Sequence, residues 1–326
     1  MATTLFSKLA CRMLALFISL VFAFTPYAPP ADTDPIQGNG ENGANMTFVA
    51  WADPQISNYM AKRFQPFSAA CEDVTAADGD IDALLIAGDI AENGLLCEYQ
   101  YVYDNLETAN VDNFIFTVGN HDVRLKNYKK VVKNFTNLMN GLNGEIGSEL
   151  KVDKLSYSYE INGYRFIVLG TDRTEFEESY LSDEQLSWLD SELKSATADG
   201  KPAFVVVHQS IKLTHGLPDT WNSPIDSAGS IGDQSDKIYE IMNRYSNVFF
   251  ITGHLHTGIG QYTYEKLGNV NSVNLPSLTI TNKDGDYNES GIGFMVEVYN
   301  NRVLFRARNF AKGEYLPEYN IEIPLV

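Results

Sequence analysis

The chain has 326 residues, of which 44% are hydrophobic and 20% are charged, a composition typical of a folded protein and not of a disordered or low-complexity one. Its 42 acidic residues outnumber its 24 basic residues, which gives a formal net charge of −18. A chain this acidic lacks the positive surface that holds nucleic acid or anionic lipid, so we expect neither duplex nucleic acid nor a membrane surface as a partner.

The first 23 residues have the pattern of a secretory signal peptide. Lys8 and Arg12 supply positive charge ahead of an apolar run over residues 13–24, which is too short to span a bilayer as a mature helix. Residues 21–23 (VFA) fit a cleavage site with small flanking residues. We therefore expect residues 1–23 to be a signal peptide and the protein to be secreted or at the cell surface, with no stable membrane span after cleavage. An uncleaved anchor or a buried helix is the alternative.

The segment over residues 24–46 is rich in Pro, Gly, Asn and Asp and has no periodic apolar pattern, which predicts a flexible leader. Neither a linker nor an internal repeat interrupts residues 47–326, so we expect these residues to form one domain. Within this domain, Cys71 and Cys97 either form one disulfide in an oxidising compartment or remain free thiols. The sequence leaves the oligomeric state open.

Short β-branched runs alternate with longer amphipathic stretches in the first half of the domain. Strands and helices that alternate at these lengths imply right-handed crossovers and a buried sheet rich in parallel strands. The predicted strands cover residues 47–52, 83–87 and 114–118, and the predicted helices cover residues 57–77, 96–109 and 127–139.

The second half of the domain begins with a hairpin, because Asn162-Gly163 separates two short runs of strand-forming residues. Ser182 and Gln185 form a capping box that opens a helix. Strands flanked by helices in both halves predict an α/β fold in which two mixed β-sheets pack face to face with helices outside. The remaining predicted strands are 157–161, 164–169, 204–207, 248–251, 270–274, 293–299 and 302–308, and the helices are 182–198 and 233–244.

Asp, Asn and His side chains gather directly after five of these strands. Ligand sites of open α/β sheets form outside the carboxyl ends of the strands, so the five loops can converge on one site. Asp and His with one Asn suit divalent metals such as Zn, Mn or Fe, and the absence of Cys argues against a closed structural zinc site. The segments are D-P-Q at 53–55, G-D-x₄-G at 88–94, G-N-H-D at 119–122, His208 and G-H-x-H at 253–256.

In this order, the five motifs resemble those of the calcineurin-like metallophosphoesterases. The resemblance extends from Asp53 to His256 and takes in most of the domain. It implies a four-layer αββα sandwich that holds two divalent metal ions, of Mn, Zn or Fe. It further implies ligands for the first ion at Asp53, Asp89 and His256, with Asp89 shared, and ligands for the second ion at Asn120, His208 and His254.

Gln55 departs from the commonest family pattern, which has a second histidine ligand at this position. A neutral amide oxygen is a weaker donor than imidazole, so direct ligation by Gln55 would weaken the first site. The alternative is that Gln55 makes an outer-sphere or hydrogen-bonding contact.

The activity that the resemblance implies is hydrolysis of a small phosphate mono- or diester by attack of a metal-bound hydroxide. His121 would stand beside the substrate as the proton donor, oriented by Asp122, or it would anchor the phosphate by its charge. A cyclic-nucleotide phosphodiesterase and a non-catalytic metal-binding protein are the alternative functions. Gln55 favours the non-catalytic protein, whereas the presence of His121 and Asp122 opposes it.

A long segment over residues 209–231 follows His208 and is expected to border the pocket. In this segment, Trp221 either stacks on a substrate group or packs the loop onto the body of the domain. His215 either contacts phosphate or is exposed. Four basic residues are further candidates for contact with an anionic substrate, although such side chains are more often solvated: Lys62, Arg63, Arg124 and Arg173.

Overall fold

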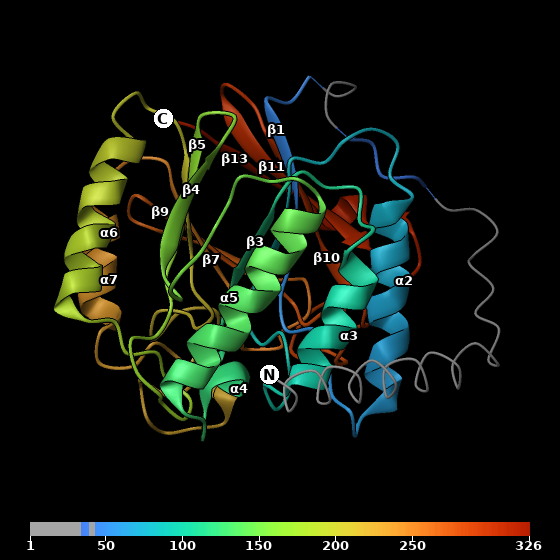
Figure 1. The fold of residues 1–326 in the computed structure, drawn as a ribbon. Helices are drawn as coiled ribbons and strands as arrows, with labels where there is room; N and C mark the ends of the chain where they lie inside the picture. Colours follow the sequence, from blue (N-terminus) through green and yellow to red (C-terminus); the bar gives the residue numbers. More distant parts are fainter. Residues whose placement is uncertain (1–33, 39–42) are drawn as a thin grey trace.

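The computed structural model describes residues 34–38 and 43–326 (Figure 1). The predicted signal peptide lies outside these residues, as does most of the predicted leader. The described part of the leader contacts the domain, because Ile36 is fully buried in the core and Gly38 donates its backbone N–H to Asp78. Among the described residues, none of the helices is both long and apolar enough to cross a membrane.

The first sheet has seven strands, which are β1 (Met46–Trp51), β2 (Ala83–Ala87), β3 (Phe114–Thr117), β10 (Ile292–Val298), β11 (Arg302–Asn309), β12 (Glu314–Tyr315) and β13 (Ile321–Pro324). They follow in the order β12-β11-β10-β1-β2-β3, and β13 also pairs with β11. β1, β2 and β3 run parallel, whereas β10 is antiparallel to β1. The parallel strands are buried along their whole length, as expected for strands covered on both faces.

The second sheet has six strands, which are β4 (Tyr157–Ile161), β5 (Tyr164–Val168), β6 (Ala203–Val206), β7 (Val248–Thr252), β8 (Tyr264–Leu267) and β9 (Val270–Asn274). Their order is β4-β5-β6-β7-β9-β8, with β5, β6, β7 and β9 parallel. The predicted hairpin joins β4 to β5. Asn162 and Gly163 both have positive φ angles, of 53° and 79°, as a tight two-residue turn of this kind requires.

Helices cover the outer faces of both sheets. They are α2 (Phe64–Thr75), α3 (Leu96–Leu106), α4 (Asn120–Val123), α5 (Tyr128–Glu145), α6 (Asp183–Ala196) and α7 (Ser235–Met242), with 3-10 turns η1 (Ala61–Arg63), η2 (Asp219–Trp221) and η3 (Pro317–Tyr319). Figure 1 shows α6 and α7 on one side of the strands and α2 and α3 on the other. Capping by Ser182, whose side chain accepts from the Gln185 N–H, opens α6 as predicted.

Aromatic side chains join the two sheets across their facing surfaces. The ring of Phe48 in β1 lies 5.2 Å from the rings of Phe166 in β5 and Phe204 in β6, measured between centroids. A second apolar cluster packs Leu189 of α6 and Ile238 of α7 against the far face of the second sheet. The predicted fold class, two mixed sheets packed face to face with helices outside, is therefore confirmed.

Two helices, α2 and α5, begin or end at other residues than predicted, near a proline and near glycines respectively. The helix predicted from residue 57 begins as an α-helix at Phe64, because Pro66 is tolerated in the first turn of a helix and not in its interior. The helix predicted to end at residue 139 continues through Gly141 and Gly144 to Glu145, held by packing of its apolar face. Three strands were not predicted: β8, whose sequence YEKL is mostly polar, and the two short strands β12 and β13 near the end of the chain.

Both cysteines of the domain are free thiols. Cys71 is buried in α2, where burial raises the pKa of its thiol. The Sγ of Cys97 accepts a hydrogen bond from Asn58. Of the two alternatives that the sequence left open, the structure has the free thiols.

Candidate metal centre

Five loops meet at the carboxyl ends of strands from the two sheets. They leave β1, β2 and β3 in the first sheet and β6 and β7 in the second, and the strands of each set are parallel and end together. The loops border a pocket of about 300 Å³. His121 and five of the seven predicted ligands line this pocket, and these ligands are Gln55, Asp89, Asn120, His254 and His256. The other two, Asp53 and His208, are fully buried beside it.

Asp89 lies between the other predicted ligands. Its Oδ2 accepts a hydrogen bond from Gln55 Nε2 at 3.1 Å and lies 3.2 Å from His208 Nε2. Its Oδ1 accepts from the backbone N–H of His121 at 2.8 Å. One carboxylate thus reaches residues of three other loops, a placement that suits a ligand shared between two ions.

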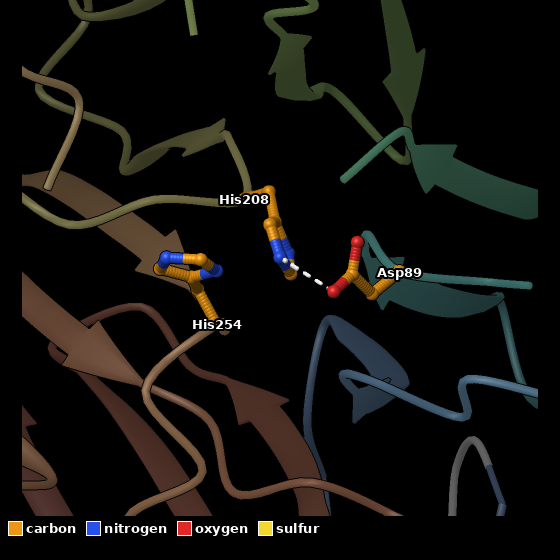
Figure 2. Close-up of side chains that lie close together, drawn as sticks. All are labelled: Asp89, His208 and His254. Carbon is orange, nitrogen blue, oxygen red and sulfur yellow. Dashed lines mark ion pairs between the residues drawn. The ribbon is translucent and has the colours of Figure 1, made fainter. Parts of the chain in front are cut away.

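Two histidines stand beside Asp89 in the second sheet's loops. Figure 2 shows His208 and His254 with Asp89, and ligand atoms of the three residues all lie within 4.8 Å of one another. His208 Nδ1 lies 2.7 Å from the carbonyl oxygen of Ala87, an acceptor, which assigns the proton to Nδ1 and leaves Nε2 facing Asp89. Nε2 is therefore the nitrogen that would bind a metal ion, once the ion has displaced the proton that the carboxylates favour there.

Asp53 connects the loop after β1 with the loop after β7. Its Oδ2 accepts from the backbone N–H of His254 at 2.9 Å, and its Oδ1 lies 3.1 Å from His256 Nε2. The same Oδ1 is 3.8 Å from His208 Nε2. The two predicted ligand groups are therefore in contact with each other through Asp53 and Asp89.

Four buried side-chain atoms at this site have no hydrogen-bond partner among the described residues. They are Gln55 Oε1, Asn120 Oδ1, His254 Nε2 and His208 Nε2, the last of which has the Asp89 carboxylate 3.2 Å away as an ion-pair partner. A buried polar atom without a partner costs roughly 1–3 kcal/mol, so four of them at one place need an explanation. Two amide oxygens and two imidazole nitrogens are donors for borderline divalent ions, and the residues present therefore fit a divalent metal ion.

The orientation of Gln55 bears on its predicted role. Its amide nitrogen donates to Asp89, so the amide oxygen is the atom that remains without a partner. This orientation presents Oε1 in the manner of a ligand and favours direct ligation over an outer-sphere contact.

Charge at the site is concentrated on Asp89 and His208. Burial alone would raise the pKa of Asp89, but the charges of His208, His121 and His254 hold this pKa well below its ordinary value. Burial would lower the pKa of His208, but Asp89 and Asp53 raise it to about 10. Burial and the charge of His208 lower the pKa of His254. A bound cation would replace the proton of His208 beside the two carboxylates.

The backbone at the site is held in an uncommon conformation. Five of the seven predicted ligands have positive φ angles, which cost of order 1–3 kcal/mol at a residue other than glycine and cluster at functional sites. They are Asp53 (51°), Gln55 (38°), Asp89 (49°), His254 (74°) and His256 (50°).

Three glycines precede ligands because nothing larger fits there. A Cβ at Gly119 would lie 2.0 Å from Asp89 Oδ1, and a Cβ at Gly253 would lie 2.5 Å from Asp53 Oδ2. A Cβ at Gly88 would lie 2.5 Å from the ring of His208, and φ at Gly88 is +87°. At Gly119 and Gly253 the reason is close approach of a carboxylate, and not a backbone conformation that only glycine adopts.

His121 lines the pocket with its ring held from one side. Its Nδ1 lies 3.0 Å from the carbonyl oxygen of Glu92 and 3.2 Å from Glu92 Oε1. The carbonyl and the carboxylate are acceptors and favour a proton on Nδ1, whereas the Arg124 guanidinium, 2.8 Å from the same nitrogen, can only donate to it. Burial would lower the pKa of His121, but Glu92 and Asp89 raise it. The second nitrogen, Nε2, lies 4.0 Å from Asp89 Oδ2 and faces the predicted ligands.

The expectation that Asp122 orients His121 is corrected by the structure. Asp122 is in the first turn of α4, and its carboxylate turns back to accept from the N–H groups of Gly119, Ile90 and Ala91 and from the hydroxyl of Tyr99. Burial and the charge of Asp89 raise its pKa to about 6. Asp122 therefore joins the loops after β2 and β3, and the carboxylate beside the His121 ring is that of Glu92.

The long segment over residues 209–231 borders the pocket through Trp221. The indole stacks on the His254 ring with centroids 4.6 Å apart, and a Cβ at Gly229 would lie 2.7 Å from the indole. Trp221 thus packs between its own loop and a predicted ligand. His215 meets neither expectation, because it is fully buried and hydrogen-bonds to Tyr262 and Ser272.

Of the four cations considered from the sequence, Arg124 lines the pocket. Lys62 is exposed, and Arg173 is exposed and pairs with Glu175. Arg63 donates to the Gln55 carbonyl oxygen and pairs with Glu92.

Sequence reasoning missed Glu92, Glu177 and Lys283. Glu92 lies inside the G-D-x₄-G motif, three residues after Asp89, so its position in the loop after β2 was a usable signal. Glu177 and Lys283 line the pocket, but they lie in loops without a motif. Their proximity to the site depends on how the two halves of the chain pack.

Comparison with known proteins gives one family match. The family described as calcineurin-like phosphoesterase matches residues 46–258. A 3',5'-cyclic-nucleotide phosphodiesterase from Nostoc sp. is 27% identical over 179 residues, which cover 54% of this chain and 56% of that protein. The match therefore spans little more than half the length of this relative.

Two solved structures share the fold. A dimetal phosphatase from Danio rerio superposes with a TM-score of 0.56 at 14% identity, covering 87% of this chain and 100% of that one. Purple acid phosphatase PPD1 from yellow lupin superposes with a TM-score of 0.58 at 13% identity, covering 86% of this chain and 53% of that one. At these identities the likeness concerns the fold alone.

Proposed function

The chain belongs to the calcineurin-like phosphoesterases, a family of metal-dependent phosphoric ester hydrolases, and we propose that it hydrolyses a small phosphate mono- or diester with two divalent metal ions. The observation that carries this proposal is the set of four buried metal-donor atoms that have no hydrogen bond and lie beside the carboxylates of Asp53 and Asp89. Six of the seven predicted ligands are buried, and hydrogen bonds and ion pairs connect them to one another.

We assign two overlapping ligand sets to these ions. The first set is Asp53, Gln55, Asp89 and His256, and the second set is Asp89, Asn120, His208 and His254. Two divalent ions held by these residues would supply a hydroxide nucleophile near neutral pH and would offset the charge of the phosphoryl oxygens. Asp89 belongs to both sets because it contacts members of each.

His121 is the proposed proton donor, and the donating atom is Nε2. Glu92 occupies Nδ1, so the doubly protonated ring presents its other proton toward the pocket. Glu92 and Asp89 favour this charged form. Arg124 and Lys283 add positive charge to the pocket wall, where they suit an anionic substrate.

The test is hydrolysis by chelated and reloaded protein. Protein stripped of metal should not hydrolyse p-nitrophenyl phosphate or bis(p-nitrophenyl) phosphate, and addition of Mn²⁺, Zn²⁺ or Fe²⁺ should restore activity on at least one of them. Full activity of the stripped protein would refute a metal-dependent mechanism.

A second candidate is hydrolysis of cyclic nucleotides. It is favoured by the match to the Nostoc protein, which carries the name of a 3',5'-cyclic-nucleotide phosphodiesterase. The same reloaded protein should then cleave 3',5'-cyclic AMP more efficiently than it cleaves p-nitrophenyl phosphate. The opposite ranking would leave monoester hydrolysis as the function.

We also propose that the protein acts outside the cytoplasm, on the strength of the charge and apolar pattern of residues 1–23. Protein recovered from its native host should then begin at or near residue 24 when its amino terminus is sequenced. An amino terminus at Met1 in the recovered protein would contradict cleavage.

A further inference from the structure

Glu177 contacts the proposed metal centre although it belongs to none of the five motifs. It lies in the loop between β5 and α6 and lines the pocket. Its Oε2 accepts a hydrogen bond from Asn120 Nδ2 at 2.8 Å, and its Oε1 accepts from Arg124 Nη1 at 3.3 Å. One carboxylate therefore joins a predicted ligand to the arginine of the pocket wall.

The contact decides which end of the Asn120 amide faces the other ligands. A carboxylate only accepts hydrogen bonds, so it binds the NH₂ group and repels the amide oxygen. Asn120 Oδ1 is consequently turned away from Glu177, and it is one of the four buried atoms without a partner. If the amide were flipped, the Asn120 amide oxygen would face the Glu177 carboxylate, and both are acceptors. The NH₂ group, which cannot bind a cation, would then point at the other ligands.

The loop that carries Glu177 is also anchored by contacts that do not involve the Glu177 side chain. The backbone carbonyl of Glu177 accepts from Gln209 Nε2 at 2.6 Å, and Gln209 Oε1 accepts from Ser179 Oγ at 2.6 Å. Gln209 is buried and directly follows the predicted ligand His208. Removal of the carboxylate should therefore leave the loop in place and free the amide of Asn120.

We propose that Glu177 is a positioning residue that fixes the Asn120 amide so that its oxygen faces the metal centre. The inference rests on the proposed function, because it requires Asn120 to be a ligand. Arg124 offsets the negative charge of Glu177 at the pocket wall, so the carboxylate can remain beside an anionic substrate. Removal of such outer partners typically costs about 10- to 100-fold in metal affinity.

Calorimetric titration of the metal-free protein with Mn²⁺ tests the proposal. Glu177→Ala should weaken binding about 10- to 100-fold, and Glu177→Gln should recover most of the loss because its amide oxygen still accepts from Asn120. Glu175→Ala is the matched control, since this carboxylate lies in the same loop and pairs with Arg173. The control should bind Mn²⁺ like the wild type.

A double variant separates this inference from the proposed function. Asn120→Ala should itself weaken Mn²⁺ binding, and Glu177→Ala should add no further loss in that background. Wild-type affinity in Glu177→Ala, or losses that add in the double variant, would overturn the inference and leave the metal site standing. Unchanged binding in Asn120→Ala would overturn the assignment of Asn120 and the inference with it. A lower melting temperature of metal-free Glu177→Ala, with unaltered Mn²⁺ affinity, would make Glu177 a structural residue.

Discussion

At the scale of single residues, His121 has one ring nitrogen bound to Glu92 and the other directed at the pocket. A proton donor matters most when the leaving group is a poor one, because nitrophenolate departs without a proton. We expect His121→Ala to lower kcat by about 10²- to 10⁴-fold on alkyl phosphate esters and much less on nitrophenyl esters. Steady-state kinetics on both classes measures this. Equal losses would instead make His121 an anchor for the phosphate charge.

Removal of the Glu92 carboxylate should change the pH dependence of kcat. Burial by itself would lower the pKa of His121, but Glu92 and Asp89 raise it by more, so the pKa lies above its ordinary value. An acid is active in its protonated form, so activity is lost as pH rises through the pKa of His121. Glu92→Gln removes one raising charge and should shift the alkaline limb of the kcat–pH profile to lower pH. A profile that stays in place would show that His121 does not set this limb.

The presence of Gln55 in the first ligand set leads us to expect unequal affinities for the two ions. Its amide oxygen is a weaker donor than the imidazole usual at this position in the family, so one ion should bind tightly and one weakly. Gln55→His should tighten the weaker step and reduce the Mn²⁺ concentration needed for half-maximal rate. Calorimetry alongside activity measures both. Two equally tight ions in the wild type would show that Gln55 does not weaken the site.

At the scale of elements, the junction between β3 and α4 determines where Asp89 can lie. A Cβ at Gly119 would lie 2.0 Å from Asp89 Oδ1, while φ at Gly119 is −107° and suits alanine. Gly119→Ala should therefore displace the carboxylate and abolish metal-dependent activity with no backbone strain of its own. Gly144→Ala in α5 is the control, because the nearest atom to its Cβ, Lys151 Nζ, is 3.6 Å away. Wild-type Mn²⁺ affinity and activity in Gly119→Ala would contradict this account.

At the scale of the whole molecule, the site joins the two sheets through contacts between carboxylates of one sheet's loops and histidines of the other's. Asp53 and Asp89 lie in loops of the first sheet, and they contact His208 and His256 from loops of the second sheet. A ligand that binds the folded state alone stabilises it by RT ln(1 + [L]/Kd), about 2.7 kcal/mol at 100 times Kd. Scanning calorimetry should therefore show a higher melting temperature with Mn²⁺ than after chelation. Identical melting temperatures would contradict metal binding by the folded protein.

The sequence by itself determined most of the elements and the order of the motifs. Strands such as β2 and β7 are runs of buried apolar residues, and the turn at Asn162-Gly163 depends on positive φ angles that local chemistry favours. The carboxyl ends of parallel strands lie at the same end of a sheet. Convergence of the loops after β1, β2 and β3 could therefore be predicted from the parallel topology. The family, with its αββα fold, followed from the motifs in their order.

Only the tertiary structure decided which side chains contact which. Adjacent residues in the short helix α4 point in different directions, so His121 faces the pocket while Asp122 turns back to the loop after β2. Glu177 and Lys283 reach the pocket from loops that no local pattern marks, because their positions depend on packing between distant segments. His215 became a buried structural residue for the same reason. Local interactions set elements within a few residues, whereas contacts across a site depend on the packing of two sheets over the whole chain.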